Sequence, residues 1–513
     1  MADQYFRSVV SQWSKINLDT QLRIMMKRST FSGAGCRRKP DPRCEVHAAQ
    51  FGILPDTGND QTQQVQHALD TLGAGGGGVL LFAPGEYAFD SPIRINHSHL
   101  IMRGMGNATR LKLRRPQTQQ KFSPWLSPAL ITAGTKLQST EKFWGVKALS
   151  AVPDKNLAGA GGIAMTGDLQ EPDFLTAITR VVDRRNFRVA EAENLHAGDF
   201  VLVTMRNTDD DGTLLKQLLD WHGAFHPLQR AALLAGPTRA ASSQFLAEVE
   251  AVADDRVTLT SPLPEELDTA FAPALYAAPL LTGIGVESLT LCCDWRGPYL
   301  HHGGGVYSVT EGNEMDYGWS AVKLFRCAHS RVSRLEIEDF TSAVELIDSR
   351  NVTVEEIVIT DTTPHGGHYG VKVYCHAEEN LFRNIRLEAF RTHAISCEGN
   401  ACGNLFQDFM VANGDLPEVS EFDLHGFADL PFAPPGHNRF ERISGIGRIT
   451  GGGGKFNLPH SGRGNTFSDI RFDLRGKALF YSWIAEDTKQ PDRMQFPGTI
   501  LDNIQILPNG PEQ

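Results

Sequence analysis

Hydrophobic positions in the second half of the chain recur with a fixed internal spacing. In each recurrence a large apolar residue is followed by two polar residues and a second apolar residue, and the first apolar residues are Val286, Val332, Val354, Phe382, Phe406, Phe440 and Phe467. Short strands that repeat every few tens of residues are typical of a solenoid, in which each coil buries a face on the next. A leucine-rich repeat would need a denser leucine pattern, and a propeller would need about forty residues per blade. The pattern therefore predicts a parallel β-helix.

A column of asparagines follows the same repeat. Each of the four lies two positions before a phenylalanine of the series, and they are Asn380, Asn404, Asn438 and Asn465. Asparagines at equivalent positions of stacked strands can form side-chain ladders. We therefore expect these four residues to occupy one column of the solenoid.

An amphipathic helix is predicted before the first strands. Apolar residues at positions 65, 68, 69 and 72 follow the spacing of one helical face. Asp60 is the expected N-cap, and the glycines from Gly73 onwards end the helix. The segment GGVLLFAPGEYAF then reads as a strand, a Pro-Gly turn and a second strand.

This opening segment, FGILPDTGNDQTQQVQHALDTLGAGGGGVLLFAPGEY, resembles the pectate-lyase superfamily of right-handed β-helix proteins. In that superfamily an N-terminal helix caps the solenoid, and a glycine-rich strand pair opens its first coil. The resemblance covers residues 47–113 closely and 283–507 by repeat pattern only. It implies an all-β, right-handed parallel β-helix and a carbohydrate-active protein, whether polysaccharide lyase, glycoside hydrolase, epimerase or phage tailspike. The calcium-binding aspartates of pectate lyases do not align here, so the resemblance assigns no residue a role.

The same patterns divide the chain into four parts. Residues 1–45 form an N-terminal arm, and residues 46–114 form the capping helix and first coils. Residues 115–282 lack the repeat and contain strand-like segments followed by a helical one over 214–236. They predict a large mixed α/β insertion that borders a cleft. Residues 283–513 form the main coils and the C-terminal cap.

The second strand of each coil carries an unusual set of polar residues. Because strand side chains alternate, residues between the apolar positions point outward and stack in columns. One predicted column contains Glu345, Lys372, Ser396, Asp423 and Asn457. The next contains Tyr374, Glu398 and His425 and ends near His460, and the one before contains Glu421 and Lys455. With coils about 4.8 Å apart, Lys372, Tyr374, Glu398, Asp423 and His425 fit within one sugar-sized patch.

These residue types favour a lyase that cleaves a uronate-containing glycan by β-elimination. The reaction needs a base, an acid and a cation that neutralises the uronate carboxylate. Lys372, Tyr374 and His425 supply the base and acid types, and Lys372, Lys455 or Arg391 can neutralise. Glu398 and Asp423 would orient His425 or hold a divalent cation such as calcium, although no segment has a calcium-loop signature. The sequence therefore assigns no cofactor and leaves calcium as an option. Further predicted substrate-binding residues are Glu421, Asn457, His460 and Trp221.

Two alternatives stay open. An inverting glycoside hydrolase would use Glu398 and Asp423, whose Cα atoms we place roughly 8 Å apart, within the range of about 6.5–9.5 Å between the carboxyl groups of such enzymes. A non-catalytic, tailspike-like glycan-binding solenoid would need aromatic platforms on the face, where Tyr374 is nearly alone.

Composition narrows the partners. The 513 residues carry a formal net charge of −11, which argues against nucleic acid and anionic membranes as partners. No apolar run is long enough to cross a membrane, and no secretory signal is recognisable, so the chain as written is expected in the cytoplasm, or outside the cell if a signal has been removed. The eight cysteines lack CxxC pairs, and Cys36 and Cys44 could form a bridge only in a secreted protein. The expected partner is a poly- or oligosaccharide, and the chain is a monomer or a homo-oligomer, with a trimer as one option.

Overall fold

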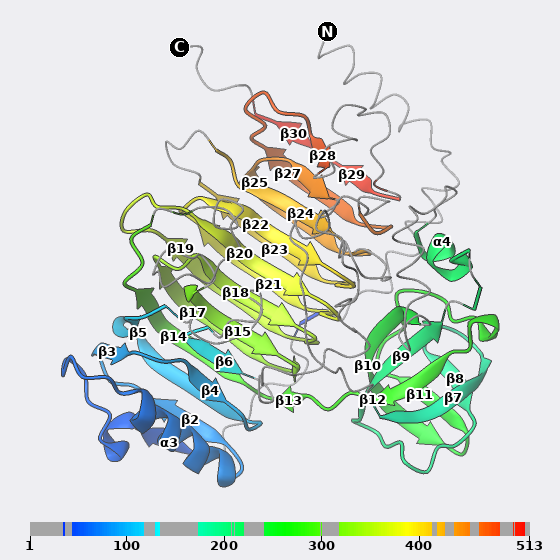
Figure 1. The fold of residues 1–513 in the computed structure, drawn as a ribbon, viewed down its shortest axis with the longest axis horizontal. Helices are drawn as coiled ribbons and strands as arrows, with labels where there is room; N and C mark the ends of the chain where they lie inside the picture. Colours follow the sequence, from blue (N-terminus) through cyan, green and yellow to red (C-terminus); the bar gives the residue numbers. More distant parts are fainter. Residues whose placement is uncertain are drawn as a thin grey trace, which may run out of the picture.

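The structure is a computed structural model that describes most of the chain. The described residues are 34–35, 44–116, 129–133, 173–206, 208–209, 211–219, 241–297, 299, 318–412, 418–425, 435–451, 461–482, 496 and 498–507. They form a parallel β-helix with a small barrel packed on its side (Figure 1). No helix among them is long and apolar enough to cross a membrane.

Two long parallel sheets form the walls of the β-helix. The first has 13 strands, and along its main path these are β1 (Glu45–His47), β2 (Gly78–Leu81), β5 (Leu100–Leu113), β14 (Gly285–Cys293), β17 (Arg331–Glu338), β19 (Thr353–Thr360), β21 (Leu381–Leu387), β23 (Leu405–Val411), β25 (Arg439–Ile446), β27 (Thr466–Phe472) and β29 (Ile500–Asp502), with β3 (Gly85–Phe89) on β5 and β30 (Gln505–Ile506) on β27. The second has nine strands, which are β4 (Ile93–Ile95), β6 (Ile131–Ala133), β15 (Ser320–Phe325), β18 (Ser342–Ile347), β20 (Gly367–Tyr374), β22 (Arg391–Glu398), β24 (Glu421–His425), β26 (Ile449–Gly451) and β28 (Phe480–Ser482). The short strands β13 (Leu281–Thr282) and β16 (Cys327–Ala328) pair with each other.

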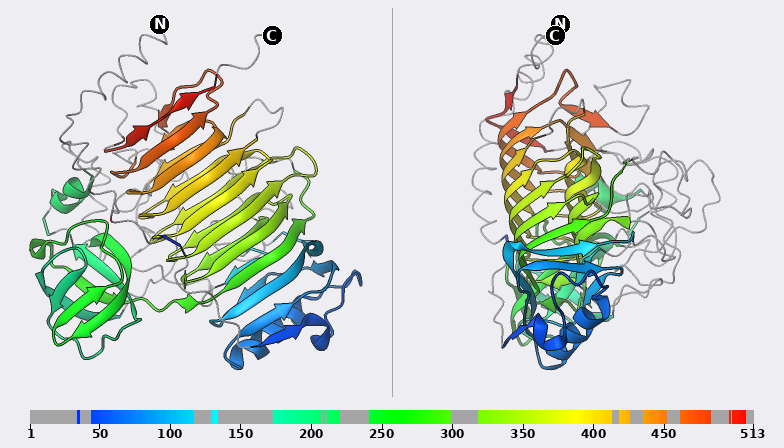
Figure 2. Two further views of the ribbon diagram at one scale, coloured as in Figure 1. Left: turned by 180° about the vertical axis from the view of Figure 1, so that it is seen from behind. Right: turned by 90° about the vertical axis from the view of Figure 1, so that its left-hand side faces the viewer.

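The chain alternates between the two sheets, so each coil adds one strand to both (Figure 2). Parallel crossover connections of this kind are right-handed in nearly all proteins. The fold is thus the predicted right-handed parallel β-helix.

The apolar repeat sets the register of the first sheet. The predicted residues pair directly from strand to strand, from Val286 through Val332 and Val354 to the four phenylalanines. Inside the coils the rings of Phe382 and Phe406 stack with centroids 4.7 Å apart, and those of Phe440 and Phe467 stack at 4.6 Å. All of these residues are buried in one continuous core. The predicted repeat is confirmed.

The asparagine column is a buried ladder. Asn380 Nδ2 donates to Asn404 Oδ1 at 3.0 Å, Asn404 Nδ2 donates to Asn438 Oδ1 at 3.0 Å, and Asn438 Nδ2 donates to Asn465 Oδ1 at 3.3 Å. Each side-chain oxygen also accepts from the backbone N–H of the preceding asparagine. The ladder therefore satisfies backbone groups at the turn from the second sheet to the first, where no sheet ladder can do so.

The N-terminal cap matches the predicted helix. Helix α3 (Thr62–Ala74) buries its predicted apolar face against the first coils, after the short helix η2 (Ala48–Phe51). Its N-cap is Gln61 rather than the predicted Asp60. Asp60 still serves the helix start, because its carboxylate accepts from the Thr62 N–H at 3.1 Å.

The described part of the insertion is mainly β structure. Six antiparallel strands close into a barrel, namely β7 (Phe174–Val181), β8 (Asn186–Val189), β9 (Phe200–Arg206), β10 (Ala241–Ala253), β11 (Arg256–Leu259) and β12 (Ala274–Ala277). Helix α4 (Thr213–Leu219) and the short helix η5 (Thr269–Phe271) accompany them. The helix predicted over 214–236 thus begins as expected, and its portion beyond Leu219 lies outside the described residues.

The barrel packs on the turns that lead from the second sheet to the first. The Leu246 N–H donates to Glu378 at 2.8 Å, and Glu248 lies 3.0 Å from His329 Nε2. Asn400 also donates to the Gln244 carbonyl. Glu378 and Asn400 follow β20 and β22 closely in sequence, so the barrel stands beside the ends of these strands (Figure 1).

Candidate functional site

A row of polar side chains runs across the outer face of the second sheet. We call it the polar row, and its directly paired members are Lys323, Glu345, Lys372, Ser396, Asp423, Thr450 and Tyr481. Four of them are the predicted column. The predicted fifth member, Asn457, is replaced by Thr450, because β26 ends at Gly451, and Asn457 itself lies outside the described residues. The adjacent predicted column of Tyr374, Glu398 and His425 is present with the expected register.

Four of the predicted side chains form a connected group. Lys372 Nζ lies 2.8 Å from Glu398 Oε1. Ser396 Oγ lies 3.0 Å from that same oxygen and 2.9 Å from Asp423 Oδ2. A serine hydroxyl has one proton, which it can donate to either carboxylate oxygen or share between the two. Ser396 therefore links the two carboxyl groups, and Glu398 connects them to Lys372.

Two phenol rings flank the lysine. Lys372 Nζ lies 4.2 Å from the centroid of the Tyr369 ring and 4.8 Å from that of Tyr374, within the range of cation–π interactions. Burial raises the pKa of Tyr374 well above its usual value. Tyr374 is therefore a neutral phenol at physiological pH, a proton donor rather than a base.

Tyr369 reaches this face through a local irregularity of the strands. Strict alternation would point Tyr369 and His393 inward with Val371 and Ile395. The strands instead step over a column of small residues, Ala321, Ala343, Gly370 and Ala394, and the register shifts by one residue after His393 where β22 meets β24. A Cβ on Gly370 would lie 2.5 Å from the Ala394 carbonyl oxygen, so only glycine fits at that point.

The result is an aromatic cluster beside Lys372 that the alternation rule missed. The Tyr369 ring stacks on His368, with centroids 3.8 Å apart, and lies 5.5 Å from His393. Its sequence signal is the segment HGGHYG, where Gly370 marks the close approach of two strands.

The connected group is buried. Lys372 and Glu398 are each 3% exposed and Asp423 is fully buried. In such surroundings charges interact strongly, and an unpaired charge is costly. A second lysine–glutamate pair, Lys323 and Glu345 at 3.4 Å, lies in the same row, and burial lowers the pKa of Lys323 despite its partner.

Among the residues that the structure describes, Arg391 and Glu421 were also predicted, and both are engaged elsewhere. Arg391, predicted to neutralise the substrate, is fully buried and donates to both oxygens of Asp361 at 2.6 and 2.9 Å and to the Phe340 carbonyl at 2.7 Å. Glu421 pairs with Arg448 Nε at 2.7 Å at the edge of the face. The predicted residues that lie outside the described side chains are Trp221, Lys455, Asn457, His460 and the imidazole of His425.

One cluster offers metal-ligating atoms. Asp339, Asp361 and His365 each bring a ligand atom within 4.8 Å of the others. Each carboxylate already faces an arginine, however, with Arg296 3.0 Å from Asp339 and Arg391 2.6 Å from Asp361. Burial alone would raise the pKa of Asp339, but hydrogen bonds from His365 and Thr362 hold it below its usual value. These charges balance without a cation, so we interpret the cluster as a brace between coils.

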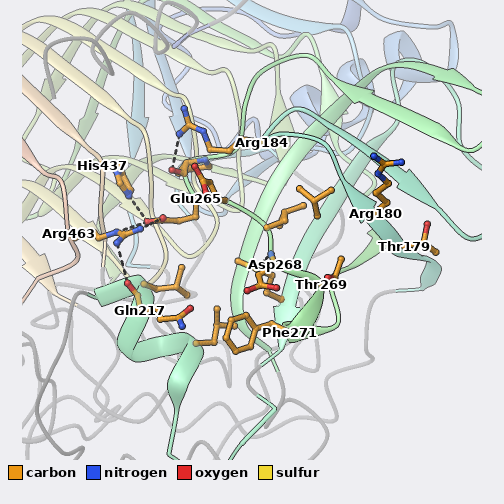
Figure 3. A pocket seen from close by; sticks show the side chains of 17 residues that line it. Thr179, Arg180, Arg184, Gln217, Glu265, Asp268, Thr269, Phe271, His437 and Arg463 are labelled. Atoms are coloured by element: carbon orange, nitrogen blue, oxygen red, sulfur yellow. Dashed lines mark hydrogen bonds and ion pairs between the residues drawn. The ribbon is translucent and has the colours of Figure 1, made fainter. Parts of the chain in front are cut away.

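A cavity lies elsewhere, at the seam between the barrel and the β-helix (Figure 3). Its volume is about 870 Å³, and Glu265 forms part of its wall. Glu265 lies 2.7 Å from His437 Nε2 and 2.9 Å from Arg463 Nε, and Arg463 also donates to the Gln217 carbonyl of α4. Burial opposes ionisation of Glu265, but these two partners lower its pKa. The charged groups at the seam are thus used to fix the barrel, and no member of the polar row lines the cavity.

Comparisons with known proteins find only distant structural similarity. Neither a protein-family model nor a curated protein sequence matches the chain. Among solved structures, a hyperthermoactive exopolygalacturonase from Thermotoga maritima is 12% identical with a TM-score of 0.38, over 92% of this chain and 83% of that one. The tailspike protein gp49 from Pseudomonas phage LKA1 is 12% identical with a TM-score of 0.37, over 91% and 82%. ORF18 of Geobacillus virus E2 is 10% identical with a TM-score of 0.38, and the match covers 90% of this chain. It covers only 61% of the viral protein, so this chain spans less than two thirds of that protein's length. At these values the activity has to be argued from the chain's own residues.

Proposed function

We propose that the chain is a carbohydrate-active enzyme that cleaves a uronate-containing glycan by β-elimination at the connected group around Lys372. The observation that carries the proposal is the position of Lys372, which lies between two phenol rings and 2.8 Å from Glu398, within a connected group that also contains Ser396 and Asp423. The resemblance of residues 47–113 to a carbohydrate-active superfamily supports the substrate class.

The roles follow from charge and proton content. Lys372 is a buried cation that would offset the uronate carboxylate and the negative charge that develops when the α-proton is removed. Tyr374, neutral because its pKa is raised, would protonate the leaving oxygen. His425 is our proposed base, since it pairs in register with Glu398 at the end of the same column. Asp423 and Glu398 would orient His425, and Glu398 holds Lys372 in place.

The carboxylate geometry disfavours the inverting hydrolase. Ser396 Oγ touches one oxygen of each carboxyl group at 3.0 and 2.9 Å, so a serine hydroxyl occupies the space between the two groups. Inverting enzymes separate their carboxyl groups by about 6.5–9.5 Å to admit a water molecule. A non-catalytic glycan-binding solenoid is the second candidate, favoured by Tyr369 and Tyr481, which add aromatic rings to the face.

The test is a screen of uronate and neutral glycans that reads ultraviolet absorbance and reducing ends together. We expect both signals to rise on a uronate polymer, because β-elimination leaves an unsaturated end. Tyr374→Phe should then lower kcat by roughly 10²–10⁴-fold, as expected for a lost general acid. The matched control is Lys323→Met combined with Glu345→Gln, which removes the other buried pair of the row and should leave kcat within a few-fold.

Other outcomes select other functions. Reducing ends without absorbance would replace elimination by hydrolysis. Binding of a glycan without either signal would leave the binding solenoid. Equal loss of activity in the Tyr374 variant and in the control would mean that the row acts through stability alone.

A further inference from the structure

A largely buried arginine, Arg448, lies on the same face, beyond the proposed catalytic group. The guanidinium carbon of Arg448 lies 3.8 Å from the centroid of the Tyr481 ring. Its Nε donates to Glu421 Oε1 at 2.7 Å, and Lys477 Nζ lies 3.7 Å from that oxygen. Arg448 is therefore held in one orientation, by a ring below its plane and a carboxylate at one edge.

The position relates this arginine to the proposed reaction. Tyr481 belongs to the polar row, two strands beyond Asp423, with Thr450 between them. Adjacent strands are about 4.8 Å apart, so Tyr481 stands roughly 10 Å from Asp423 along the row. Arg448 directly precedes β26, the strand that carries Thr450. A sugar bound there would belong to the same glycan chain as the one at Lys372.

The charges at this place are uneven. Glu421 has 7% of its side chain exposed, whereas Arg448 has 16% and Lys477 has 40%. The carboxylate thus lies behind two cations, and the accessible charge is positive. Among the residues that the structure describes, Glu421 engages Arg448 through Nε, and no described acceptor meets its Nη1 and Nη2 groups.

We propose that Arg448, with Lys477, forms an anion-binding subsite for a carboxylate or sulfate on a sugar unit that flanks the cleaved one. The two Nη groups of a guanidinium form a planar fork that matches the paired oxygens of such groups, which a lysine ammonium cannot reproduce. The stacked ring fixes the fork before the ligand arrives, which lowers the entropy cost of binding. The subsite deepens the proposed function and rests on it for the identity of the glycan, but not for binding itself.

The experiment is calorimetric titration of the full-length protein with three probes at low and moderate salt. These are an oligogalacturonate, its carboxyl-reduced neutral counterpart, and a sulfated heparin oligosaccharide. We expect an anionic probe to bind and the neutral one to bind at least tenfold more weakly. Arg448→Met should weaken the anionic probe by roughly 10–100-fold, the usual effect of a lost charged hydrogen bond. Which anionic probe binds distinguishes the carboxylate from the sulfate.

Two further variants make the result specific. Arg448→Lys keeps the charge and the ring contact but loses the fork, so it should fall between the wild type and Arg448→Met. Arg442→Met removes an exposed arginine of β25, in the first sheet, that pairs with Asp408 of β23. This variant should bind the probes like the wild type. Failure of both anionic probes to bind, or equal binding by the Arg448 and Arg442 variants, would overturn the subsite. Binding that depends on Arg448 without any unsaturated product would keep the subsite and refute the lyase.

Discussion

The asparagine ladder offers the sharpest test of the fold, and Asn404 is its most informative member. It is fully buried between Asn380 and Asn438. Its oxygen accepts from the Asn380 N–H at 3.1 Å and from Asn380 Nδ2 at 3.0 Å. Its amide donates to the Ala377 carbonyl at 2.9 Å and to Asn438 Oδ1 at 3.0 Å. Asn404→Ala removes all four interactions at one turn.

The cost follows from what each former partner retains. Asn380 Nδ2 still donates to the Ser349 carbonyl, and the Ala377 carbonyl still accepts from the Cys402 N–H. Asn438 Oδ1 keeps the Asn404 N–H, so only the Asn380 N–H loses the acceptor it has among the described residues. An orphaned buried donor costs about 1–3 kcal/mol, and each of the other lost bonds about 0.5–1.5 kcal/mol. We therefore expect Asn404→Ala to lower the free energy of unfolding by roughly 2.5–7.5 kcal/mol.

Urea unfolding followed by tryptophan fluorescence measures this change, and hydrogen exchange localises it. Exchange should accelerate first in the coils on either side of Asn404, since each coil of a solenoid contacts only its neighbours. The control is Asn107→Ala at an exposed position, where surface substitutions change stability by less than about 0.5 kcal/mol. If the two variants unfold at the same urea concentration, the ladder contributes no stability and the hydrogen-bond reasoning is wrong.

Three further predictions test other parts of the structure. Gly370→Ala should lower the melting temperature, at a cost of about 1–3 kcal/mol, because its Cβ would meet the Ala394 carbonyl oxygen at 2.5 Å; an unchanged melting temperature would contradict the close approach of these strands. Lys372→Met should lower the free energy of unfolding by about 3–5 kcal/mol, because it leaves Glu398 buried without its cation. The double variant Lys372→Met with Glu398→Gln should recover most of this stability. Urea denaturation of both variants measures the difference, and an equal loss of stability in the two would mean that the pair is not coupled. The lowered pKa of Glu265 means that its stabilising contribution is complete above its unfolded pKa of about 4.3 and is lost as the pH falls through the folded value; the stability difference between wild type and Glu265→Gln should shrink on acidification, and a constant difference would refute the linkage.

The fold could be predicted from the sequence because each coil of the solenoid repeats the core contacts of the coil before it. Every coil places an apolar residue in the same row, so Phe382, Phe406 and Phe440 repeat in the sequence as they stack in space. Asn404 and its equivalents repeat for the same reason, since each closes the same turn. The outward column from Lys372 to Asp423 could be predicted from alternation alone, once the inward positions were known.

Features that depend on a local irregularity of a strand, or on the packing of the barrel against the β-helix, could not be predicted from the sequence. The outward position of Tyr369 and His393 does not follow from alternation, because one small residue at position 370 or 394 changes the alternation without changing the hydrophobic pattern. Arg391 was taken for a substrate contact because nothing near it in sequence reveals Asp361, its partner from the preceding coil. The seam around Glu265 joins residues nearly two hundred positions apart, which no repeat connects.

The lysines of the polar row do not by themselves indicate where the proposed site lies, because both Lys323 and Lys372 form buried pairs with a glutamate. The two pairs differ in the residues of the adjacent column. Beside Lys323 and Glu345 that column is apolar, with Phe325 and Ile347, and from β20 onwards it becomes Tyr374, Glu398 and His425. The proposed chemistry is therefore placed on β20, β22 and β24. The barrel is fixed at the same level, through Glu378 after β20 and Asn400 after β22, so the described part of the insertion lies beside the coils to which we assign the proposed site. A sugar chain on this face would thus lie beside the barrel, with Arg448 further along the row.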